Sequence, residues 1–568
     1  MMKQRYIDLM EKALSAYTDE HILRYFNDVK TNGLTEHGFP RLTANIGILI
    51  AHGKRRDLLP LFMEMMEVCC DMFLRPYVQA GNEFSVREIV CCIKELEDAE
   101  AVEAKDILRW KQKISQIVPE ACYNVVVKRE TDRMTNWAIF GAVSEYARFY
   151  FGLGENHDFI NRQLSCQLQW LDENGMYRDN LQTLVHQPIM YDYASRGLFA
   201  MLLHFGYRGK YYEQLDSCLK RSGLLTLKMQ SPNGEIPFGG RSNQFLHNEP
   251  WMMLLFEYEA RRYVKEGNIE LAKTFKAAIA RALDATEAWL NKQPIRHIKN
   301  SFPTETSYGC EEYAYFDKYM ITTASNLYAA YLLCDDSIPT IIAPDHEPAV
   351  LQTSYHFHKL FLKSGGYALE FDTNADPRYD ASGLGRVHRE GAPSTICLSC
   401  PCPADPVYTL NVKQPFAFSL CAAIRKKDEW CFGADEGTKY EVWDSGIDKD
   451  RASTTILCQF AEGRMIKEHY TVNENGVHIT LEGDGEIGYT LPALCFDGAT
   501  SPEITAEEHS LTVSYEGWIC RYTTNGRICD LNRIAANRNG HYRVFVASAQ
   551  SALHVTIEIF RSVREGSC

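Results

Sequence analysis

The spacing of apolar residues in this 568-residue chain changes at about residue 335. Before that point apolar residues recur every three or four positions, as in Arg56–Arg75, which is the period of a packed amphipathic helix. After about Pro339 they alternate with polar residues, the period of a half-buried strand. The change predicts a multidomain α+β protein, with a helical domain over 1–338 and an antiparallel β-sandwich over 339–568.

The helical part divides into about a dozen segments separated by short turns such as Asn174-Gly175 and Asn233-Gly234. Helices of similar length that follow one another in pairs, without a strict sequence repeat, predict an (α/α) toroid of helical hairpins. Besides the segment named above, the expected helices cover roughly 2–16, 41–53, 85–117, 135–152, 157–172, 187–205, 210–228, 244–266, 268–292 and 317–334.

The later part contains many short strand patterns with no helix between them, which is typical of an antiparallel sandwich. Asn475-Gly476 is a strong hairpin signal directly before the alternating run Val477–Leu481, and Val555–Ile559 alternates in the same way. Other expected strands lie near 355–372, 394–399, 416–424, 430–434, 454–472, 509–523 and 541–549.

Composition narrows the class of protein. A net charge of -14 without any basic run argues against a nucleic-acid-binding surface. The 19 cysteines include adjacent pairs, which favours free thiols in a reducing compartment over a disulfide framework. The first residues lack the apolar core of a signal peptide, and no apolar run approaches a membrane span. A cytoplasmic protein without membrane partners is therefore expected, with a homo-oligomer left open.

The densest group of proton-transfer residues lies in the stretch from His186 to Gly197, where Pro188 can open a helix that carries Tyr191 and Tyr193. Ordinary interpretations also exist. Asp192 and Arg196 are spaced as a helix-face pair, a tyrosine here can pack in the core, and His186 can be a capping or buried histidine.

Two further polar segments, one before this stretch and one after it, are expected to join it in one site. Asn136-Trp137 follows Thr135 at an expected helix start, and Gly240-Arg241-Ser242-Asn243 follows the tyrosines. Asn136 can also be a simple helix cap. The succession of an Asn-Trp pair, a histidine before a tyrosine-bearing helix, and a Gly-Arg-Ser segment resembles the toroidal polysaccharide lyases. These are the hyaluronate/chondroitin lyase group and the heparinase II/III-like group.

The resemblance implies cleavage of uronic-acid glycans by β-elimination, without metal or cofactor. Asn136 and Arg241, with Asn243 or Gln244, would neutralise the substrate carboxylate, and Trp137 would contact the sugar. His186 or a tyrosinate would remove the C5 proton, and a tyrosine would protonate the leaving O4. The tyrosine spacing after His186 departs from the hyaluronate-lyase pattern, so Tyr191 and Tyr193 both stay candidates.

Two clusters outside this region are further candidates. The glycine-rich and charged segment 378–391 interrupts the strand pattern, as an exposed functional loop does. The resemblance implies that the sandwich supplies a histidine to the cleft, here His388, while Arg386 and Arg389 would bind a second acidic group. Tyr308, in the aromatic segment 307–319, would stack on sugar or pack between the domains.

Two groups of residues have the spacing of metal ligands. His356 and His358 share a face of an expected strand, and Cys397, Cys400 and Cys402 are closely spaced. No clear fourth ligand accompanies either group, so the cysteines are expected in the sandwich core.

The main rival function is a glycoside hydrolase, because toroids also hold paired carboxylates. Its candidate acids are Glu173, Asp179, Asp192, Glu235 and Glu249. Glu235 follows Asn233-Gly234 and is expected at the mouth of the cleft, where it would also contact substrate in the lyase. A non-catalytic carbohydrate-binding protein is the second rival. An acidic oligosaccharide is the expected partner, and the absence of a signal peptide favours short imported fragments.

Overall fold

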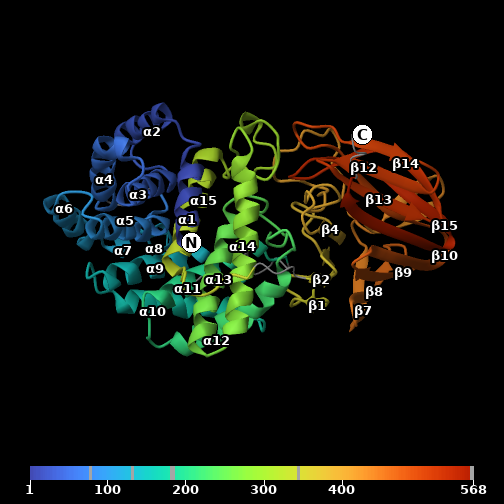
Figure 1. The fold of residues 1–568 in the computed structure, drawn as a ribbon, viewed down its shortest axis with the longest axis horizontal. Helices are drawn as coiled ribbons and strands as arrows, with labels where there is room; N and C mark the ends of the chain where they lie inside the picture. Colours follow the sequence, from blue (N-terminus) through green and yellow to red (C-terminus); the bar gives the residue numbers. More distant parts are fainter. Residues whose placement is uncertain (76–79, 129–132, 180–185, 342–345, 563–568) are drawn as a thin grey trace, which may run out of the picture.

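The computed structural model describes residues 1–75, 80–128, 133–179, 186–341 and 346–562. Helices fill the first part of the chain and antiparallel strands the second, and the two parts lie side by side along the long axis (Figure 1). The predicted α+β fold, with a helical toroid followed by a strand domain, is confirmed. The last helix ends at Leu333 and the first strand begins at Ala349.

Six helices form a closed inner ring in which each contacts the next and the last contacts the first. Most of their residues are buried, because a helix inside a toroid packs on nearly every face. In ring order they are α3 (Gly38–Ala51), α5 (Val86–Asp98), α9 (Asn136–Tyr150), α11 (Ile189–His204), α13 (Asn248–Lys265) and α15 (Phe316–Leu333).

An outer layer of more amphipathic helices covers the ring. Each outer helix packs against one or two inner ones, so its apolar stripe faces inward and its charged side faces solvent. This layer contains α1 (Met2–Leu14), α4 (Leu59–Phe73), α6 (Ala104–Ser115), α10 (His157–Gln167), α12 (Tyr212–Met229) and α14 (Ile269–Asn291).

The strand domain consists of two sheets. The smaller has the order β1-β2-β3-β4 and covers Ala349–Gln352, Lys359–Ser364, Tyr367–Asp372 and Gly383–Arg389. The larger, eleven-stranded sheet is built on two long strands, β10 (Gly476–Phe496) and β15 (His541–Arg561). β9 (Met465–Asn473) and β10 form the hairpin that Asn475-Gly476 predicts, with Asn473 opposite Gly476.

The other strands of the large sheet are short and flank this centre. They are β5 (Ala422–Lys426), β6 (Glu429–Phe432), β7 (Lys439–Asp448), β8 (Arg451–Gln459), β11 (Glu503–Ala506), β12 (Ser510–Tyr515), β13 (Trp518–Thr524) and β14 (Arg527–Ala536).

Three local predictions differ from the structure. The expected helix over 85–117 is two helices, because Glu100 takes a left-handed backbone (φ 48°) between α5 and α6. A helix not foreseen, α2 (Asp19–Asn32), buries only Ile22, Phe26 and Val29 and is capped by Thr18. The expected strand at 394–399 is absent, and only Leu398 pairs there, through an isolated bridge to Val387.

A buried ion pair joins the two domains. Arg538, between β14 and β15, reaches Glu311 before α15 at 2.6 Å, and both side chains are almost fully buried. The same guanidinium donates to the Gly309 carbonyl oxygen at 2.5 Å and lies 3.9 Å from the ring centroid of Tyr408. The strand domain is therefore anchored next to the ring rather than tethered loosely.

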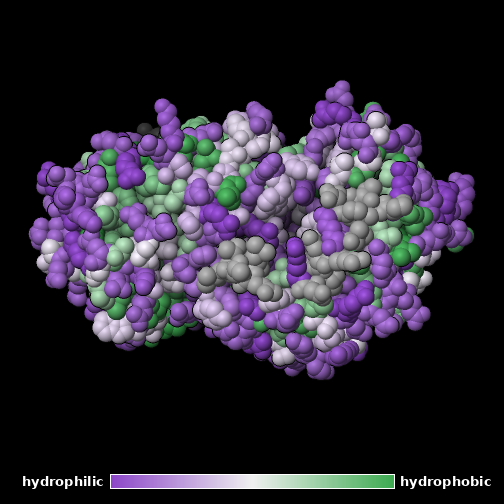
Figure 2. All heavy atoms as spheres, turned by 180° about the vertical axis from the view of Figure 1, so that it is seen from behind, coloured by the Kyte–Doolittle hydropathy of each residue, from purple (hydrophilic) through white to green (hydrophobic). Residues whose placement is uncertain are grey.

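Three further properties hold for the described residues. Their cysteines are all free, and most are buried. No helix within these ranges is both long and apolar enough to cross a membrane. Over the same residues, no group of three or more His, Cys, Asp or Glu side chains is arranged to hold a metal ion. The face in Figure 2 is mostly hydrophilic, with hydrophobic residues in scattered patches.

Candidate active site

A cavity of about 290 Å³, here called the ring chamber, lies where the inner helices begin. Each of the six inner helices contributes a residue from its first turns or from just before it. The lining residues are His37, Arg41, Phe84, Asn136, Trp137, Phe140, Met190, Tyr191, Ala194, Arg241, His247, Trp251, Tyr313, Lys318, Tyr319 and Thr322. The inner helices thus point their amino termini at one space.

The charged side chains that line the ring chamber are all basic. Arg41, Arg241 and Lys318 line it, and its described lining contains no Asp or Glu. Helix amino termini add partial positive charge from their unsatisfied N–H groups. Arg41 is paired at 3.2 Å with Glu88, which is not part of the lining. Arg241 is paired with Asp179, which also lies outside the lining.

Asn136 and Arg241 are held side by side by one carboxylate. The Asn136 side-chain amide donates to Asp179 Oδ2 at 2.9 Å, and Arg241 meets the same oxygen at 2.7 Å. Asp179 also accepts the Asn136 backbone N–H at 2.8 Å. The helix cap is Thr135, whose hydroxyl accepts from the Trp137 N–H, so the capping interpretation of Asn136 is wrong. The Asn136 side chain faces the chamber instead.

Tyr191 is one of three tyrosines that meet at a single hydroxyl. Its hydroxyl lies 3.0 Å from Ser242 Oγ, which is 3.0 Å from the Tyr313 hydroxyl and 2.9 Å from the Tyr319 hydroxyl. The Arg241 guanidinium lies 4.2 Å from the centroid of the Tyr191 ring. Proton donors and a cation therefore stand together at one wall of the chamber.

Two histidines that the sequence analysis missed complete the chamber. Burial and the nearby Arg41 charge lower the pKa of His37 well below its usual value, and they lower the pKa of His247 to about 3. Both imidazoles are consequently neutral at physiological pH. Their shared position at the start of inner helices was the signal that could have found them.

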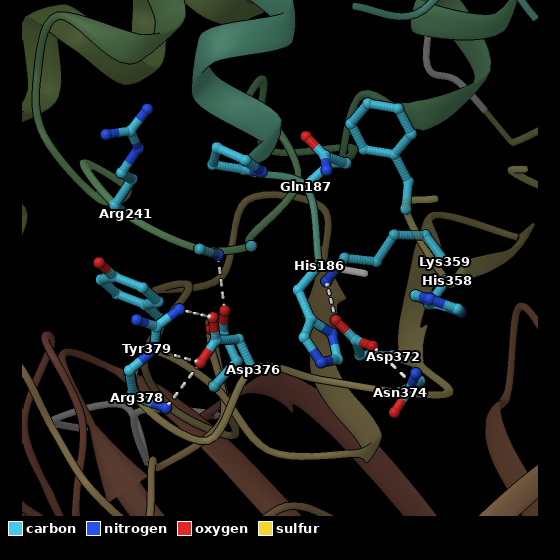
Figure 3. Close-up of a pocket in the computed structure, with 15 residues that line it drawn as sticks. His186, Gln187, Arg241, His358, Lys359, Asp372, Asn374, Asp376, Arg378 and Tyr379 are labelled. Atoms are coloured by element: carbon cyan, nitrogen blue, oxygen red, sulfur yellow. Dashed lines mark hydrogen bonds and ion pairs between the residues drawn. The ribbon is translucent and has the colours of Figure 1, made fainter. Parts of the chain in front are cut away.

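A second cavity of about 150 Å³, the interface pocket, lies between the ring and the small sheet. Arg241 lines both cavities, and His186 lines only this one. Figure 3 shows Arg241, Tyr379 and Arg378 on one side, and His186, His358 and Lys359 on the other. The His186 ring is 5.9 Å from the His358 ring.

Unlike the ring chamber, the interface pocket is rich in carboxylates. Burial raises the pKa of Asp380 to about 7, and this residue accepts the Gly240 N–H at 2.6 Å. Asp376 is also buried, which raises its pKa, but hydrogen bonds and charge from Arg378 outweigh burial and lower it overall. Asp372 pairs with Lys359 at 3.0 Å. The sequence analysis assigned no role to these three acids.

Several residues predicted to contact substrate are buried elsewhere. Tyr193 is fully buried on the opposite face of α11 from Tyr191, with the Arg196 guanidinium 5.0 Å from its ring centroid. His388 is 1% exposed, lies 3.2 Å from the Ser399 hydroxyl, and has its pKa lowered to about 3 by burial and by Arg386. Neither residue lines the two cavities, so the site described here does not include them.

The arginines of the 378–391 segment have structural partners. Arg386 is 2% exposed, donates to the Ile236 carbonyl oxygen at 2.7 Å, and pairs with Glu370 at 3.2 Å. Arg389 donates to the Gly365 carbonyl oxygen at 2.5 Å and lies over the Tyr367 ring. Neither lines the ring chamber or the interface pocket: Arg386 is used at the contact between the two domains, and Arg389 within the small sheet.

The remaining residues predicted to contact substrate line neither cavity and have structural partners instead. Asn243 donates to the Pro237 carbonyl oxygen at 3.1 Å, and Gln244 accepts from Asn539 of the strand domain at 3.3 Å. Tyr308 stacks on Phe302 with ring centroids 3.5 Å apart, and its hydroxyl donates to the Gly540 carbonyl oxygen of the strand domain at 3.4 Å, which agrees with interdomain packing. Glu235 is buried and meets Lys299 at 3.2 Å.

The carboxylates proposed for the rival hydrolase do not form a pair in either cavity. Asp192 is buried in an ion pair with Arg196, as its helix-face spacing predicts. Glu249 shares Lys299 with Glu235, at 2.5 Å. Asp179 is held by Asn136 and Arg241, and Glu173 is exposed. Any two-carboxylate chemistry would therefore need the interface acids instead.

Comparison with known proteins returns similarity in structure only. No protein-family model matches the chain, and no curated protein matches its sequence. A heparan sulfate lyase mutant from Pedobacter heparinus is 8% identical over 93% of this chain and 76% of its own, with a TM-score of 0.48. A chondroitin AC lyase mutant from Streptomyces coelicolor is 10% identical over 98% of this chain and 79% of its own, with a TM-score of 0.49.

A glycosyl hydrolase family 88 protein from Bacteroides vulgatus is also similar, at 11% identity over 58% of this chain and 99% of its own, with a TM-score of 0.37. The similar solved structures thus include toroidal polysaccharide lyases, the group that the motif order resembles, together with a glycoside hydrolase. Similarity at this level concerns architecture, so the chemistry has to be read from the cavities themselves.

Proposed function

We propose that this protein is a lyase that cleaves short, uronic-acid-containing oligosaccharides by β-elimination in the ring chamber. The observation that carries the proposal is the lining of the chamber. Three cations and six helix amino termini surround a space with tyrosine hydroxyls and no carboxylate among its described lining. Such a space binds an acid and supplies proton transfer, but it lacks the two carboxylates that hydrolysis of a glycoside requires.

Recognition of the carboxylate is the first step. The C5 proton of a uronic acid is very weakly acidic until the neighbouring carboxylate is neutralised. Asn136 and Arg241 would donate hydrogen bonds to that carboxylate and stabilise the charge that develops as C5 loses its proton. Asp179 positions both donors, since it binds each of them within 3 Å.

Proton transfer is the second step. Tyr191 is the base we propose, because it lines the chamber directly beside the carboxylate-binding Arg241, whose guanidinium lies 4.2 Å from its ring centroid. The pair of electrons from C5–H forms the C4–C5 double bond, and the C4–O4 bond breaks. Tyr313, which also lines the chamber, would protonate the departing O4. His186 is the alternative base, reaching the substrate from the interface pocket.

The size and walls of the chamber support a short substrate. Its volume of about 290 Å³ is at the lower end for ligand pockets, which favours one or two sugar rings over a polymer. Trp137 and Trp251 offer apolar faces on which a ring can stack. We therefore propose short oligosaccharides as the substrates.

The test is an absorbance assay for the conjugated alkene that β-elimination creates. The purified full-length chain is incubated with a panel of uronic-acid oligosaccharides, and product is followed in the ultraviolet. Alkene formation that disappears in Arg241→Ala supports the proposal. Sugar release across the panel without any alkene contradicts it.

One observation favours a second candidate, a glycoside hydrolase acting at the interface pocket. The environments of Asp380 and Asp376 push their pKa values in opposite directions, as an acid and base pair requires. This candidate predicts sugar release without alkene from a chromogenic glucuronide, abolished by Asp380→Asn. Elimination predicts no release from this glucuronide, whose O4 carries no leaving sugar, and it predicts alkene formation from the oligosaccharide panel that survives Asp380→Asn.

A further inference from the structure

The Ser242 hydroxyl is the meeting point of three tyrosine hydroxyls. Tyr191 and Tyr313 are each 3.0 Å from it, and Tyr319 is 2.9 Å from it. A hydroxyl can donate one hydrogen bond and accept two, so three partners fill its capacity. Ser242 is completely buried, and all three tyrosines line the ring chamber. The hydroxyl is thus shielded by the groups that face the substrate.

The backbone holds this hydroxyl in place. Ser242 has a left-handed conformation (φ 57°), which is uncommon for a residue with a side chain. Its N–H donates to Glu311 Oε1 at 2.7 Å, and that same oxygen accepts from Arg538 at 2.6 Å. Two domains therefore fix one serine, although glycine would fit this conformation more easily.

The three tyrosines are not equivalent. Burial, Tyr191 and Glu311 raise the pKa of Tyr313, and burial together with Tyr191 raises that of Tyr319 well above its usual value. Both are firmly protonated. Tyr191 alone among them has the Arg241 guanidinium against its ring, at 4.2 Å. Tyr313 is 37% exposed and can reach substrate, whereas Tyr319 is 7% exposed and lies edge-on to Phe245.

We infer that Ser242 is a proton relay that carries the proton taken up by Tyr191 to Tyr313 within each turnover. This inference rests on the proposed elimination. After the reaction Tyr191 holds the C5 proton, and Tyr313 has lost its proton to O4. Tyr191 then donates its proton to Ser242 Oγ while the Ser242 hydroxyl donates its own to the Tyr313 oxygen. The phenolate returns to Tyr191, and no proton is exchanged with solvent.

The experiment compares Ser242→Ala and Ser242→Gly with the unmodified chain, using the oligosaccharide that it converts to alkene. Both variants remove the hydroxyl, and glycine also accepts the left-handed backbone without strain. We expect kcat to fall about 10- to 100-fold with KM changed less than about twofold, because binding groups stay in place. Ser195→Ala, which alters a buried serine on α11 outside both cavities, is the matched control and should keep kcat.

A proton inventory separates relay from positioning. In mixtures of light and heavy water, kcat of the unmodified chain should depend on deuterium content along a curve, since several protons move together. The dependence should become linear in both Ser242 variants. Curvature that persists in the variants, or kcat within about threefold of the unmodified chain, overturns the relay.

Two further measurements keep the inference falsifiable. If the Ser242 variants do not fold, Tyr313→Phe provides the test, since it removes the receiving hydroxyl while leaving the serine. Tyr313→Phe should make the dependence of kcat on deuterium content linear. A dependence that stays curved in this variant overturns the relay. If the unmodified chain forms no alkene from any uronic-acid substrate, the proposed function fails. Alkene formed at full rate without Ser242 leaves that function standing and removes only the relay.

Discussion

The ring chamber and the interface pocket share Arg241, and both are lined by cations, but only the interface pocket also has carboxylates among its described lining. Helix amino termini and cations surround the first, and its described lining has no acid. Three aspartates line the second, together with His186 and Lys359. Arg241 lines both cavities, so its role depends on which of the two binds the substrate. The contrast teaches that overall fold leaves elimination and hydrolysis both open, while the placement of carboxylates separates them.

Removing the proposed base should have the largest effect on activity. Tyr191→Phe should lower kcat about 10³-fold, because it deletes a proton-transfer group while keeping the ring in the chamber. His186→Ala is the matched change in the other cavity and should lower kcat less than about tenfold. Initial rates of alkene formation give both values. The opposite ranking would transfer the base role to His186.

Removing the shared arginine should have the next largest effect. Arg241→Ala should reduce kcat/KM about 10²- to 10³-fold, since the developing charge loses a positioned donor. Arg241→Lys keeps the charge but loses the planar fork, so it should recover only part of the activity. Steady-state kinetics on one oligosaccharide measures the two variants. Unchanged activity in Arg241→Ala would mean that neither cavity binds the carboxylate through this residue.

A smaller effect is expected at the chamber wall. Trp137→Ala should raise KM about tenfold and change kcat little, because stacking on the sugar contributes to binding more than to proton transfer. Trp289 lines neither the ring chamber nor the interface pocket, so Trp289→Ala is the matched control and should keep KM. A fall in kcat without a change in KM would assign Trp137 a different role.

The smallest effect on activity is expected in the interface pocket, where the readout is stability. Asp380→Asn should keep alkene formation within about threefold under elimination. In the folded protein the pKa of Asp380 is about 7, against 3.8 for the ordinary group, so the folded state binds the extra proton between these values. Its contribution therefore makes the unmodified chain less stable as pH rises from about 4 to above 7, by about 4 kcal/mol.

The asparagine variant lacks this penalty. Asn can still accept the Gly240 N–H, so the advantage in Tm of Asp380→Asn over the unmodified chain should grow between pH 5 and pH 8. Thermal unfolding across that range measures the difference. A difference that stays constant with pH would show that Asp380 is ionised in the folded protein throughout.

Periodicity was enough to predict the ring and the strand domain, because each inner helix and each hairpin follows local rules. The order of Asn136, His186, Tyr191 and Arg241 also predicted a polar cleft, and the structure brings Asn136, Tyr191 and Arg241 to one chamber. Tyr191 and Tyr193 could not be separated in advance. Residues two apart on a helix point about 200° apart, so one had to face away, but only tertiary packing decides which.

The parts that the sequence did not reveal depend on distant segments. Arg41, His247 and Tyr319 come from three inner helices and meet only when the ring closes. The burial of His388 follows from strand pairing of β3 with β4 and from Arg386 beside it, neither of which has a local signature. Ser242 looked like one polar residue in a polar run, and its three tyrosine partners lie about 50 to 80 positions away along the chain.

The ion pair between Glu311 and Arg538 limits which strand domains can be combined with this helical ring. Glu311 sits on the ring side and Arg538 on the strand side, and each is buried enough that neither charge can be left alone cheaply. A graft of a foreign strand domain onto the ring must therefore bring an arginine at the same point. Without it, Glu311 is left as an unpaired buried charge against the Ser242 N–H, so a recombination breakpoint between the two halves is expected to disturb the chamber even though every lining residue is retained.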